Sequence, residues 1–491
     1  MTKWHQIAET LHLPSRALIG GALKEASDGG TLPAINPATG AEIARVAACT
    51  ADDVHSAVVA ARASFDGGAW SRAAPAHRKA ALLRLAELLR AELDRLAVME
   101  SLDMGKLVTQ ARGNDLPNAI GILQWHAEEA DKAYGETTSP RPGNTVLIER
   151  VPLGVVGAVV PWNFPLNMAL WKCTPALAAG NSVVLKPAEQ SNFTALRFGE
   201  LALEAGLPEG VLNVVPGHGA VAGRALGLHP DVDVLAFTGS TEVGRLFLQY
   251  AGQSNLKQVW LECGGKSPLI VFADCDDLPG AAAAAAEGIF YNQGQVCSAT
   301  SRVLVDRKVA APFAELLRGE LAKYRPGDPL DPASGMGPLV SAAQQRRVLG
   351  YIEAGRREAT LLAGGGQPEG TGFHVEPTIL TDVPPGATIA QEEIFGPVLA
   401  VTTFESEAEA IALANGSAYG LAASLWTSDF RRAHRVAAAI RAGLVAVNAV
   451  DPIDPAVPFG GFRQSGFGRD LSRHAAEKYT GLRSTWLRFA S

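Results

Sequence analysis

From residue 155 onward, short runs rich in valine, leucine and isoleucine alternate with segments of helical periodicity. Such alternation is typical of a parallel sheet with helices on both faces. A first series of strands is expected at 155–160, 182–186, 211–215, 232–238 and 258–262. A second series is expected at 267–272, 302–306, 398–404, 422–427 and 444–448. The sequence therefore predicts an α/β fold with two doubly wound lobes that meet near residues 262–266, with a cleft between them.

The N-terminal region and the C-terminal tail carry different signals. Helices are expected at 51–65, 77–99 and 117–132, and Thr50 resembles an N-cap followed by acids in the first turn. A short helix and a loose lead-in are expected for 1–30, and short strands around turns for 31–50. The SPRPGN segment at 139–144 breaks any helix and leads to an exposed pairing segment at 145–151. The tail from Lys478 alternates like an edge strand that pairs outside its own lobe.

Size and charge narrow the class of protein. At 491 residues the chain is long enough for two or more domains, and its net charge of −7 argues against nucleic acid or an anionic membrane as the main partner. The N-terminus lacks signal-peptide features, and prolines and Asn163 interrupt the apolar stretch at 151–171, which favours a buried strand and helix over a membrane span. Five scattered cysteines form neither a disulfide framework nor a metal-binding spacing, so we expect a cytoplasmic setting and no metal site.

Two segments follow predicted strands where a nucleotide could bind. In LKPAE at 185–189, Lys186 and Glu189 can reach ribose hydroxyls in the crevice, and a carboxylate there would favour NAD over NADP. A solvated lysine–glutamate pair is the alternative. In FTGSTEVG at 237–244, Gly239 permits a turn and Ser240 can bind a phosphate oxygen at a helix start. This segment lacks the GxGxxG fingerprint, so a plain helix cap remains an alternative.

Three residues are candidates for covalent chemistry. Glu262 in WLECGGKSP and Cys297 in YNQGQVCSA are too distant in sequence to share one helix, but folding could bring base and nucleophile to one carbon atom. Asn163 in PWNFP lies between two prolines and is either an oxyanion donor or a partner of nearby backbone. The segments EEIFGPV at 392–398 and PFGGFRQSGFGRD at 458–470 are either cavity walls or surface loops.

Together these segments closely resemble the aldehyde dehydrogenase superfamily, from about Asn36 to the C-terminus. The resemblance rests on PWNFP, LKPAE, FTGSTEVG, LECGGKSP, GQVCSA, EEIFGPV and PFGGFRQSG in this order and spacing. The segments DKAYGE, FADCDD, GIFYNQGQVC and GRDLSRHAAEKYT are most similar to the bacterial γ-glutamyl-γ-aminobutyraldehyde dehydrogenase branch. The resemblance implies an NAD-binding domain at 1–132 and 153–263 and a catalytic domain at 264–474. It also implies an oligomerisation arm at 133–152 and 475–491, in a homodimer or homotetramer.

The resemblance further implies roles for individual residues. Cys297 matches the nucleophile, Glu262 the general base and Asn163 the oxyanion-binding amide, while Lys172 and Asp470 match positions behind the reacting groups. Cofactor contacts are implied for Val160, Pro161, Trp162, Lys186, Glu189, Gly219, Phe237, Gly239, Ser240, Gly244, Leu261, Cys263, Gln344, Glu393 and Phe395. A substrate tunnel is implied for Asn114, Asn118, Phe164, Met168, Trp171, Val296, Ser298, Ile453 and Phe459.

These roles predict a covalent reaction. The Cys297 thiolate would add to the aldehyde as a thiohemiacetal, whose alkoxide the Asn163 amide holds. Hydride loss to the nicotinamide of NAD would leave a thioester, which water activated by Glu262 hydrolyses to the carboxylic acid. Two departures from the family pattern weaken the transfer of roles: Cys263 replaces an aliphatic residue, and Asp470 is shorter than the glutamate of many relatives.

The substrate depends on the loop AVDPIDPAVPF, which adds Asp451 and Asp454. If one of these acids receives an amino group, the substrate is an ω-amino or γ-glutamylamino aldehyde from polyamine breakdown. If both face solvent, a broad-specificity aliphatic or aromatic aldehyde dehydrogenase is the alternative. A CoA-acylating dehydrogenase is a further alternative, although such enzymes generally lack the base that Glu262 matches. A non-enzymatic protein of this fold would be expected to lack the nucleophile or the base.

Overall fold

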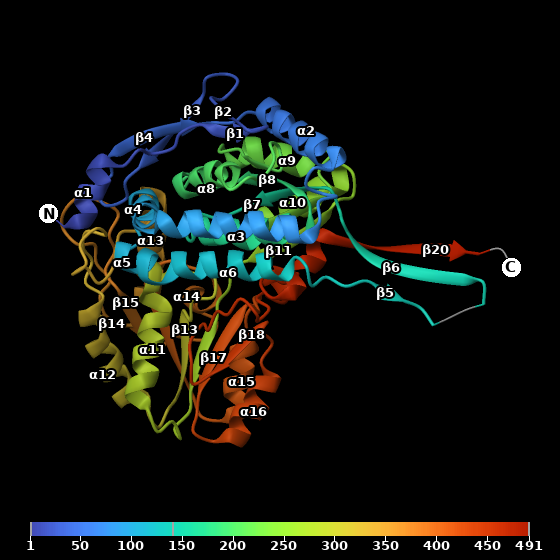
Figure 1. The fold of residues 1–491 in the computed structure, drawn as a ribbon. Helices are drawn as coiled ribbons and strands as arrows, with labels where there is room; N and C mark the ends of the chain where they lie inside the picture. The colour runs from blue at the N-terminus through green and yellow to red at the C-terminus, as the bar shows by residue number, and fades with distance from the viewer. Residues whose placement is uncertain (1, 140–141, 490–491) are drawn as a thin grey trace.

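The computed structural model describes residues 2–139 and 142–489. Residues 1, 140–141 and 490–491, which belong to the predicted helix-breaking segment and the predicted domain ranges, lie outside the described residues. Two α/β lobes lie one above the other in Figure 1, and a ribbon of strands projects to one side.

The upper lobe of Figure 1 is built on an eight-stranded sheet in the order β19–β11–β10–β7–β8–β9–β1–β2. Its central strands run parallel, and their bounds agree with the first predicted series within two residues. They are β7 (Val155–Val159), β8 (Ser182–Lys186), β9 (Leu212–Val214), β10 (Val234–Gly239) and β11 (Gln258–Cys263). The edges are antiparallel strands, namely β1 (Ala17–Ile19), β2 (Ala22–Lys24) and β19 (Gly466–Phe467).

Helices cover both faces of this sheet because alternate strand residues point to opposite sides. In β7, Val156 and Ala158 join one core, and Val155 and Val159 join the other. The first core includes α3 (Pro75–Ala91), α4 (Leu93–Met104), α6 (Leu116–Glu129), α7 (Pro165–Ala179) and α8 (Phe193–Glu204). The second includes α2 (Ala51–Gly67), α9 (Arg224–Leu228) and α10 (Thr241–Gln253).

The lower lobe is built on a seven-stranded sheet in the order β14–β15–β16–β13–β12–β17–β18. Its strands are β12 (Pro268–Val271), β13 (Arg302–Asp306), β14 (Thr360–Ala363), β15 (Thr378–Thr381), β16 (Val398–Phe404), β17 (Ala422–Trp426) and β18 (Leu444–Val447). Its helices are α11 (Leu278–Phe290), α12 (Ala310–Glu320), α13 (Ala342–Glu358), α14 (Thr388–Gln391), α15 (Glu407–Asn415) and α16 (Phe430–Ala439). All five strands of the second predicted series are confirmed, whereas β14 and β15 were not predicted.

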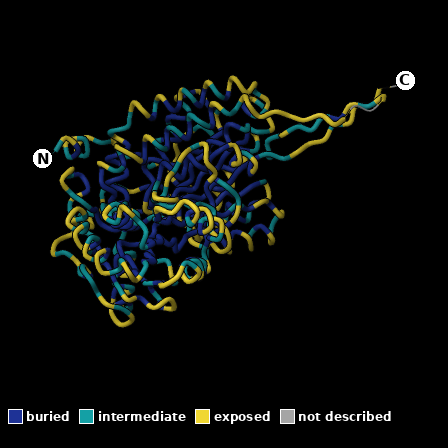
Figure 2. The backbone as a smooth tube through the Cα atoms, turned by 90° about the horizontal axis from the view of Figure 1, so that it is seen from below, coloured by how far each residue is buried: buried dark blue, intermediate teal, exposed yellow. Residues whose placement is uncertain are grey.

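The projecting ribbon joins two segments that are distant in sequence. Strand β6 (Asn144–Pro152) pairs antiparallel with β20 (Thr480–Arg488) along its whole length, and β5 (Glu136–Thr137) pairs with β6. The expected pairing segments at 145–151 and at the C-terminal tail are therefore confirmed. Much of this arm is exposed or only partly buried, in contrast to the interior of the lobes (Figure 2).

Two N-terminal predictions were wrong. The helix expected at 77–99 is two helices, because Glu92 leaves the helical conformation at φ −100° and ψ 12°. Its carboxylate accepts hydrogen bonds of 2.6 and 3.0 Å from Arg197 on α8. The break depends on this tertiary contact, and no proline or glycine near Glu92 indicates it in the sequence. Within 1–30, the expected short helix is confirmed as α1 (Lys3–Thr10), whereas the segment expected as a loose lead-in forms the hairpin β1–β2. Three-residue strands are too short to show a periodic pattern.

The remaining elements are short. Thr50 is the N-cap of α2 and accepts a 3.3 Å hydrogen bond from the Asp53 N–H, as predicted, and the expected short strands at 31–50 are β3 (Thr31–Ile35) and β4 (Glu42–Ala47). The others are α5 (Val108–Gln110), η1 (Ala111–Asp115), η2 (Gly219–Gly223), η3 (Tyr291–Gly294), η4 (Leu321–Lys323), η5 (Arg463–Ser465) and η6 (Arg473–Tyr479). Across residues 2–139 and 142–489, no helix has the length and apolarity to cross a membrane.

Candidate active site

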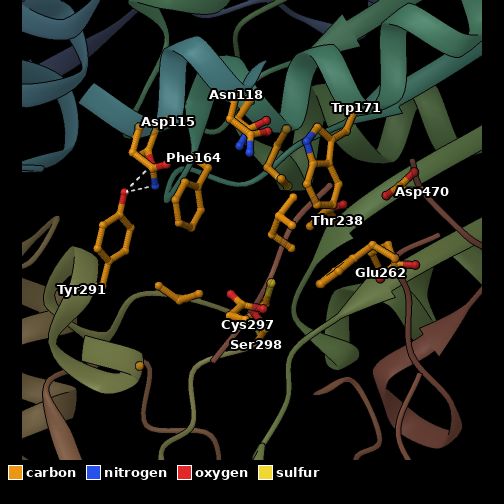
Figure 3. A pocket seen from close by; sticks show the side chains of 18 of the residues that line it. Asp115, Asn118, Phe164, Trp171, Thr238, Glu262, Tyr291, Cys297, Ser298 and Asp470 are labelled. Carbon is orange, nitrogen blue, oxygen red and sulfur yellow. Dashed lines mark hydrogen bonds between the residues drawn. The ribbon is translucent and has the colours of Figure 1, made fainter. Parts of the chain in front are cut away.

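A cavity of about 230 Å³ lies where helices of the upper lobe face loops of the lower lobe, and Figure 3 shows its side chains. Both Glu262 and Cys297 line it, so folding brings the predicted base and nucleophile to one space. Its walls include the tunnel residues expected from sequence, namely Asn114, Asn118, Phe164, Met168, Trp171, Val296, Ser298, Ile453 and Phe459. Further lining residues are Asp115, Asn167, Thr238, Cys263, Glu287, Gly288, Tyr291, Val450, Asp451 and Asp470.

The turn before Cys297 has an unusual backbone. Asn292 and Gln293 have φ values of 48° and 57°, in the left-handed region that glycine prefers. A Cβ on Gly265 would lie 2.8 Å from the Cys297 carbonyl oxygen, so glycine in the ECGGK segment lets the two motifs approach. Burial raises the pKa of the Cys297 thiol, and the neighbouring acids Asp451, Glu393 and Glu262 raise it further. The thiol therefore needs a base before it can act as a thiolate nucleophile.

Glu262 lies near the end of β11 and is 5% exposed. Neither of its carboxylate oxygens has a hydrogen-bond partner among the described residues. Burial, and then the negative charge of Asp470, raise the pKa of Glu262 to about 8, against the opposing effect of Lys172 and Lys478. A carboxyl group that titrates near the operating pH can exchange protons with the thiol and with water.

Asn163 is buried and bonded to the segment that precedes Cys297. Its side-chain amide donates a 2.8 Å hydrogen bond to the Gln295 carbonyl oxygen, and its own carbonyl accepts a 2.9 Å bond from Asn292. The backbone-bonding alternative is thus observed for one amide hydrogen. Because a primary amide has two hydrogens, the second remains a candidate oxyanion donor.

A buried ion cluster lies behind Glu262. The two carboxylate oxygens of Asp470 accept hydrogen bonds from the ammonium groups of Lys172 and Lys478, one each. All three side chains are at most 3% exposed. Lys172 comes from α7 and Lys478 from η6, and Asp470 exchanges two backbone hydrogen bonds with Phe459, at 2.7 and 2.8 Å.

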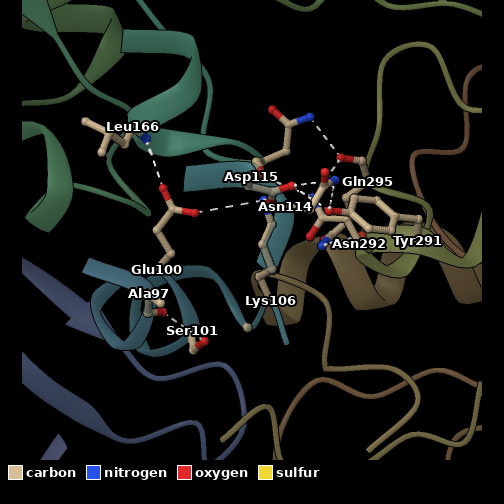
Figure 4. Close-up of polar contacts among 12 residues, drawn as sticks. Ala97, Glu100, Ser101, Lys106, Asn114, Asp115, Leu166, Tyr291, Asn292 and Gln295 are labelled. Atoms are coloured by element: carbon tan, nitrogen blue, oxygen red, sulfur yellow. Dashed lines mark hydrogen bonds and ion pairs between the residues drawn. The ribbon is translucent and has the colours of Figure 1, made fainter. Parts of the chain in front are cut away.

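A second polar network supports the cavity wall opposite Glu262 (Figure 3), and Figure 4 shows its contacts. Tyr291 donates its hydroxyl hydrogen to Asp115, and the Asn114 amide donates to the Tyr291 hydroxyl at 3.0 Å. The buried Lys106 ammonium pairs with Asp115 and lies 4.0 Å from Glu100. This network fixes the loop before Cys297 to the helices at residues 93–129.

The polar groups expected to bind a dinucleotide gather at the carboxyl ends of β8 and β10. Lys186 Nζ lies 3.7 Å from Glu189 Oε2, and Glu189 Oε1 accepts a 2.6 Å hydrogen bond from the Gly219 N–H. Ser240 is the N-cap of α10 and accepts a 3.3 Å bond from the Val243 N–H, so the helix-cap alternative is also observed. Phe237 and Gly239 belong to β10, Gly244 to α10, and Leu261 and Cys263 to β11.

The loop at 392–398 closes the same region from the lower lobe. The partly buried Glu393 carboxylate accepts a 3.1 Å hydrogen bond from the Gly265 N–H, and desolvation raises its pKa to about 7. Gln344 on α13 donates to the Phe395 carbonyl at 2.8 Å. The rings of Phe395 and Trp162 meet edge to face, with their centroids 5.3 Å apart. Trp162 directly follows Val160 and Pro161 in the sequence. This set of a lysine, carboxylates, a helix N-terminus and aromatic rings fits a dinucleotide.

A sequence model described as "Aldehyde dehydrogenase family" matches residues 24–485. The chain belongs to the aldehyde dehydrogenase family. An aminoacetaldehyde dehydrogenase of Pseudomonas aeruginosa is 51% identical over 482 residues, which cover 98% of this chain and 97% of the relative. This aldehyde dehydrogenase therefore matches a full-length relative, and the predicted family is confirmed.

Two solved structures resemble this aldehyde dehydrogenase over 99% of each chain with a TM-score of 0.98. One is gamma-glutamyl-gamma-aminobutyraldehyde dehydrogenase from Burkholderia cenocepacia, at 52% identity. The other is indole-3-acetaldehyde dehydrogenase of P. syringae, at 51% identity, in complex with NAD+ and IAA. The predicted fold class is confirmed, and NAD(P)-dependent oxidation of a small-molecule aldehyde follows from the family membership.

Several residues of this aldehyde dehydrogenase site were not anticipated. Asp115 and Tyr291 adjoin predicted motifs, but only their mutual hydrogen bond reveals them as a pair. Lys478 lies within GRDLSRHAAEKYT, a segment that indicated a family branch and gave no local sign of an ion pair.

Asp454 lies on the exposed side of its loop, where it accepts a 2.8 Å bond from the Ala456 N–H, and it does not line the cavity.

Proposed function

We propose that this aldehyde dehydrogenase oxidises its substrate through a covalent bond to Cys297, with Glu262 as the general base. The observation that carries the proposal is that the Cys297 thiol and the buried Glu262 carboxyl group, which has no hydrogen-bond partner among the residues the structure describes, line one small cavity. A thiolate suits the reaction because it attacks a carbonyl well and also leaves well.

The chain's own residues account for the proton transfers and for the charge on oxygen. Glu262 accepts the thiol proton, and the Cys297 sulfur forms a bond to the aldehyde carbon. The second hydrogen of the Asn163 amide and the Cys297 backbone N–H bind the resulting alkoxide. NAD supplies the hydride acceptor when bound. The acyl group remains on sulfur while Glu262 releases the thiol proton to solvent. Glu262 then takes a proton from water, whose oxygen attacks the thioester and releases the Cys297 thiolate.

The residues proposed to hold NAD are those at the ends of β8 and β10 and in the 392–398 loop. Lys186 and Glu189 would bind ribose hydroxyls, and Ser240 with the first amides of α10 would bind a phosphate. Glu393 and the rings of Trp162 and Phe395 would orient the other end of the dinucleotide. Because Glu189 is held by Lys186 and Gly219, its charge would repel a 2′-phosphate, which favours NAD over NADP.

For the substrate we propose an ω-amino or γ-glutamylamino aldehyde. Asp451 lines the cavity, and its Oδ1 is buried without a hydrogen-bond partner among the described residues. The names of the P. aeruginosa and B. cenocepacia relatives support a nitrogen-containing aldehyde. The P. syringae relative supports the alternative, an aromatic aldehyde, which the apolar side chains Phe164, Trp171 and Phe459 would also accommodate.

We also propose the domain roles and the subunit assembly that the sequence predicts. The domain at 1–132 and 153–263 binds NAD, and the domain at 264–474, whose strand β19 pairs with the upper sheet, carries catalysis. The arm (133–152 and 475–491) joins subunits into a cytoplasmic homodimer or homotetramer. Exposed apolar residues on the arm, Leu482, Leu487 and Phe489, favour an assembly in which another surface covers them.

A panel of aldehydes tests the proposal. The enzyme is mixed with NAD or NADP, with or without CoA, and with an aminoaldehyde, an uncharged aliphatic aldehyde of equal length or an aryl acetaldehyde. The absorbance of NADH or NADPH is followed, and the acyl product is identified. Turnover of the aminoaldehyde with the highest kcat/KM supports the substrate assignment. Equal values for all three aldehydes would contradict it, and acyl transfer to CoA in place of water would contradict the role of Glu262.

A further inference from the structure

The buried ion cluster contains one more lysine than the proposed reaction uses. Asp470 could be neutralised by Lys172 alone, yet its other oxygen is bonded to Lys478, which is 3% exposed. Burying a second ammonium group costs free energy, so it requires a compensating interaction. The cluster lies against Glu262, whose pKa responds to Asp470 and to both lysines.

The charge balance of the cluster depends on Glu262. Among the described residues, the titratable groups that act on Glu262 or Asp470 are Lys172, Lys478, Arg469, His126, Tyr479, Cys263 and Cys297. Burial lowers the pKa of His126 to about 3 and raises the pKa of the Cys263 thiol to about 12, so both are neutral near pH 7. Two buried ammonium groups therefore balance two buried carboxylates when Glu262 is ionised. Without Lys478, the two carboxylates would face one buried lysine and the half-buried Arg469.

Hydrogen bonds cannot substitute for this charge. Neither oxygen of Glu262 accepts a hydrogen bond within the described residues, so nearby cations are the main source of stabilisation for its ionised form. In a buried site, an opposite charge a few ångströms away has a stronger effect than in water. Lys478 also holds the side chain of Asp470 from the side opposite to its bond with Lys172, through the second carboxylate oxygen.

We propose that Lys478 is a positioning residue that favours the ionised form of the general base Glu262 by balancing the charge of Asp470. The inference rests on the proposed roles of Cys297 and Glu262 and adds the residue that maintains the base.

Hydrolysis of an activated aryl ester isolates the step in which Glu262 acts. The ester acylates Cys297 without any cofactor, and the burst of released phenolate counts the active sites. The slow phase that follows measures hydrolysis of the acyl group from sulfur. Its rate per active site is recorded against pH for the wild-type enzyme, Lys478→Met, Lys478→Gln and Lys478→Arg.

In Lys478→Met and Lys478→Gln, we expect the rising limb of the pH profile to move to higher pH by about one unit, which makes hydrolysis below the limb about tenfold slower. The burst should keep its amplitude, and Lys478→Arg should keep the wild-type limb because it retains the charge. An unmoved limb in either neutral variant that shows a burst would overturn the inference. An equal shift in Lys478→Arg would overturn it as well.

Glu262→Gln distinguishes the two levels of the proposal. If the rate of acyl-enzyme hydrolysis in this variant rises with pH as it does in the wild-type enzyme, Glu262 is not the base, and the proposed function fails. If Glu262→Gln removes the limb while the neutral Lys478 variants leave it in place, only the role of Lys478 fails. Loss of the limb in Glu262→Gln together with its displacement in Lys478→Met supports both.

Discussion

Ser298 and Asp451 are joined by a hydrogen bond of 2.7 Å from the serine hydroxyl to Asp451 Oδ2. The contact ties the residue that follows the nucleophile to the acid in the tunnel wall. Asp451 Oδ1 is buried without a partner among the described residues, and burial raises the pKa of this carboxyl group. A buried carboxylate without a full set of donors is costly, so a cationic group on a substrate would stabilise it.

This relationship predicts that Asp451→Asn lowers kcat/KM for an ω-amino aldehyde by about 10- to 100-fold, the range expected for a lost hydrogen bond to a charged group. The value for an uncharged aldehyde of equal length should change little. Asp454→Asn is the matched control, because Asp454 is an exposed acid of the same loop that does not line the cavity. An equal fall for both aldehydes in Asp451→Asn would contradict recognition of the amino group.

Glu262→Gln should separate formation of the acyl-enzyme from its hydrolysis. The amide can accept a proton neither from the thiol nor from water, so we expect a slowed burst of NADH followed by a turnover that is slower still. Rapid-mixing absorbance with an excess of aldehyde measures both phases.

Cys297→Ala should abolish turnover and burst alike while it preserves NAD binding, measured by calorimetry. Wild-type NADH production by Cys297→Ala would rule out the covalent scheme.

Parts of this structure that depend on short-range patterns could be predicted from the sequence. The strands at 182–186, 302–306 and 398–404 agree in both bounds with β8, β13 and β16, because buried parallel strands are continuous apolar runs. The site residues in PWNFP and GQVCSA were candidates from their local context, and the family resemblance gave them roles, since a lone asparagine or cysteine carries little information by itself.

Parts that depend on tertiary contacts could not be predicted. The break at Glu92 is stabilised by Arg197, more than a hundred residues away, and Lys478 reaches Asp470 only because η6 folds back beside α7. For Asp451 and Asp454, the sequence offered two equivalent acids in one proline-rich loop. Only the backbone conformation decides that Asp451 points into the cavity and Asp454 away from it.

The oxyanion role of Asn163 predicts a large effect on the chemical step. Asn163→Ala removes the amide hydrogen that is not used by Gln295, so we expect kcat to fall by roughly 100- to 1,000-fold, as for other oxyanion donors. Binding of NAD should be unchanged, because Asn163 makes its described side-chain contact with the backbone before Cys297. A fall in kcat of less than tenfold, in a variant with the wild-type melting temperature, would argue that Asn163 only fixes this loop.

Activity should rise with pH because the base acts in its ionised form. Burial and Asp470 raise the pKa of Glu262 to about 8, so Glu262 is mostly protonated at pH 6 and mostly ionised at pH 10. The hydrolysis step should therefore reach half of its maximal rate near pH 8, and burial of the Cys297 thiol should shift the attack step in the same direction. Steady-state kcat measured from pH 6 to 10 checks this, and a plateau that is complete by pH 6 would contradict it.

Glu189 should determine the discrimination between NAD and NADP. Burial opposes its ionisation, but Lys186 and the Gly219 N–H hold the pKa of Glu189 below its usual value, so the carboxylate is charged at neutral pH. Glu189→Gln removes the charge that would repel a 2′-phosphate, and we expect the KM for NADP to fall by about tenfold or more. The KM for NAD should rise only modestly, because glutamine can still accept a hydrogen bond from ribose. Glu204→Gln removes one exposed negative charge that pairs with Arg197 at 3.1 Å, and as the matched control it should alter neither KM. If both variants shift the KM for NADP equally, the discrimination arises from net charge and not from Glu189.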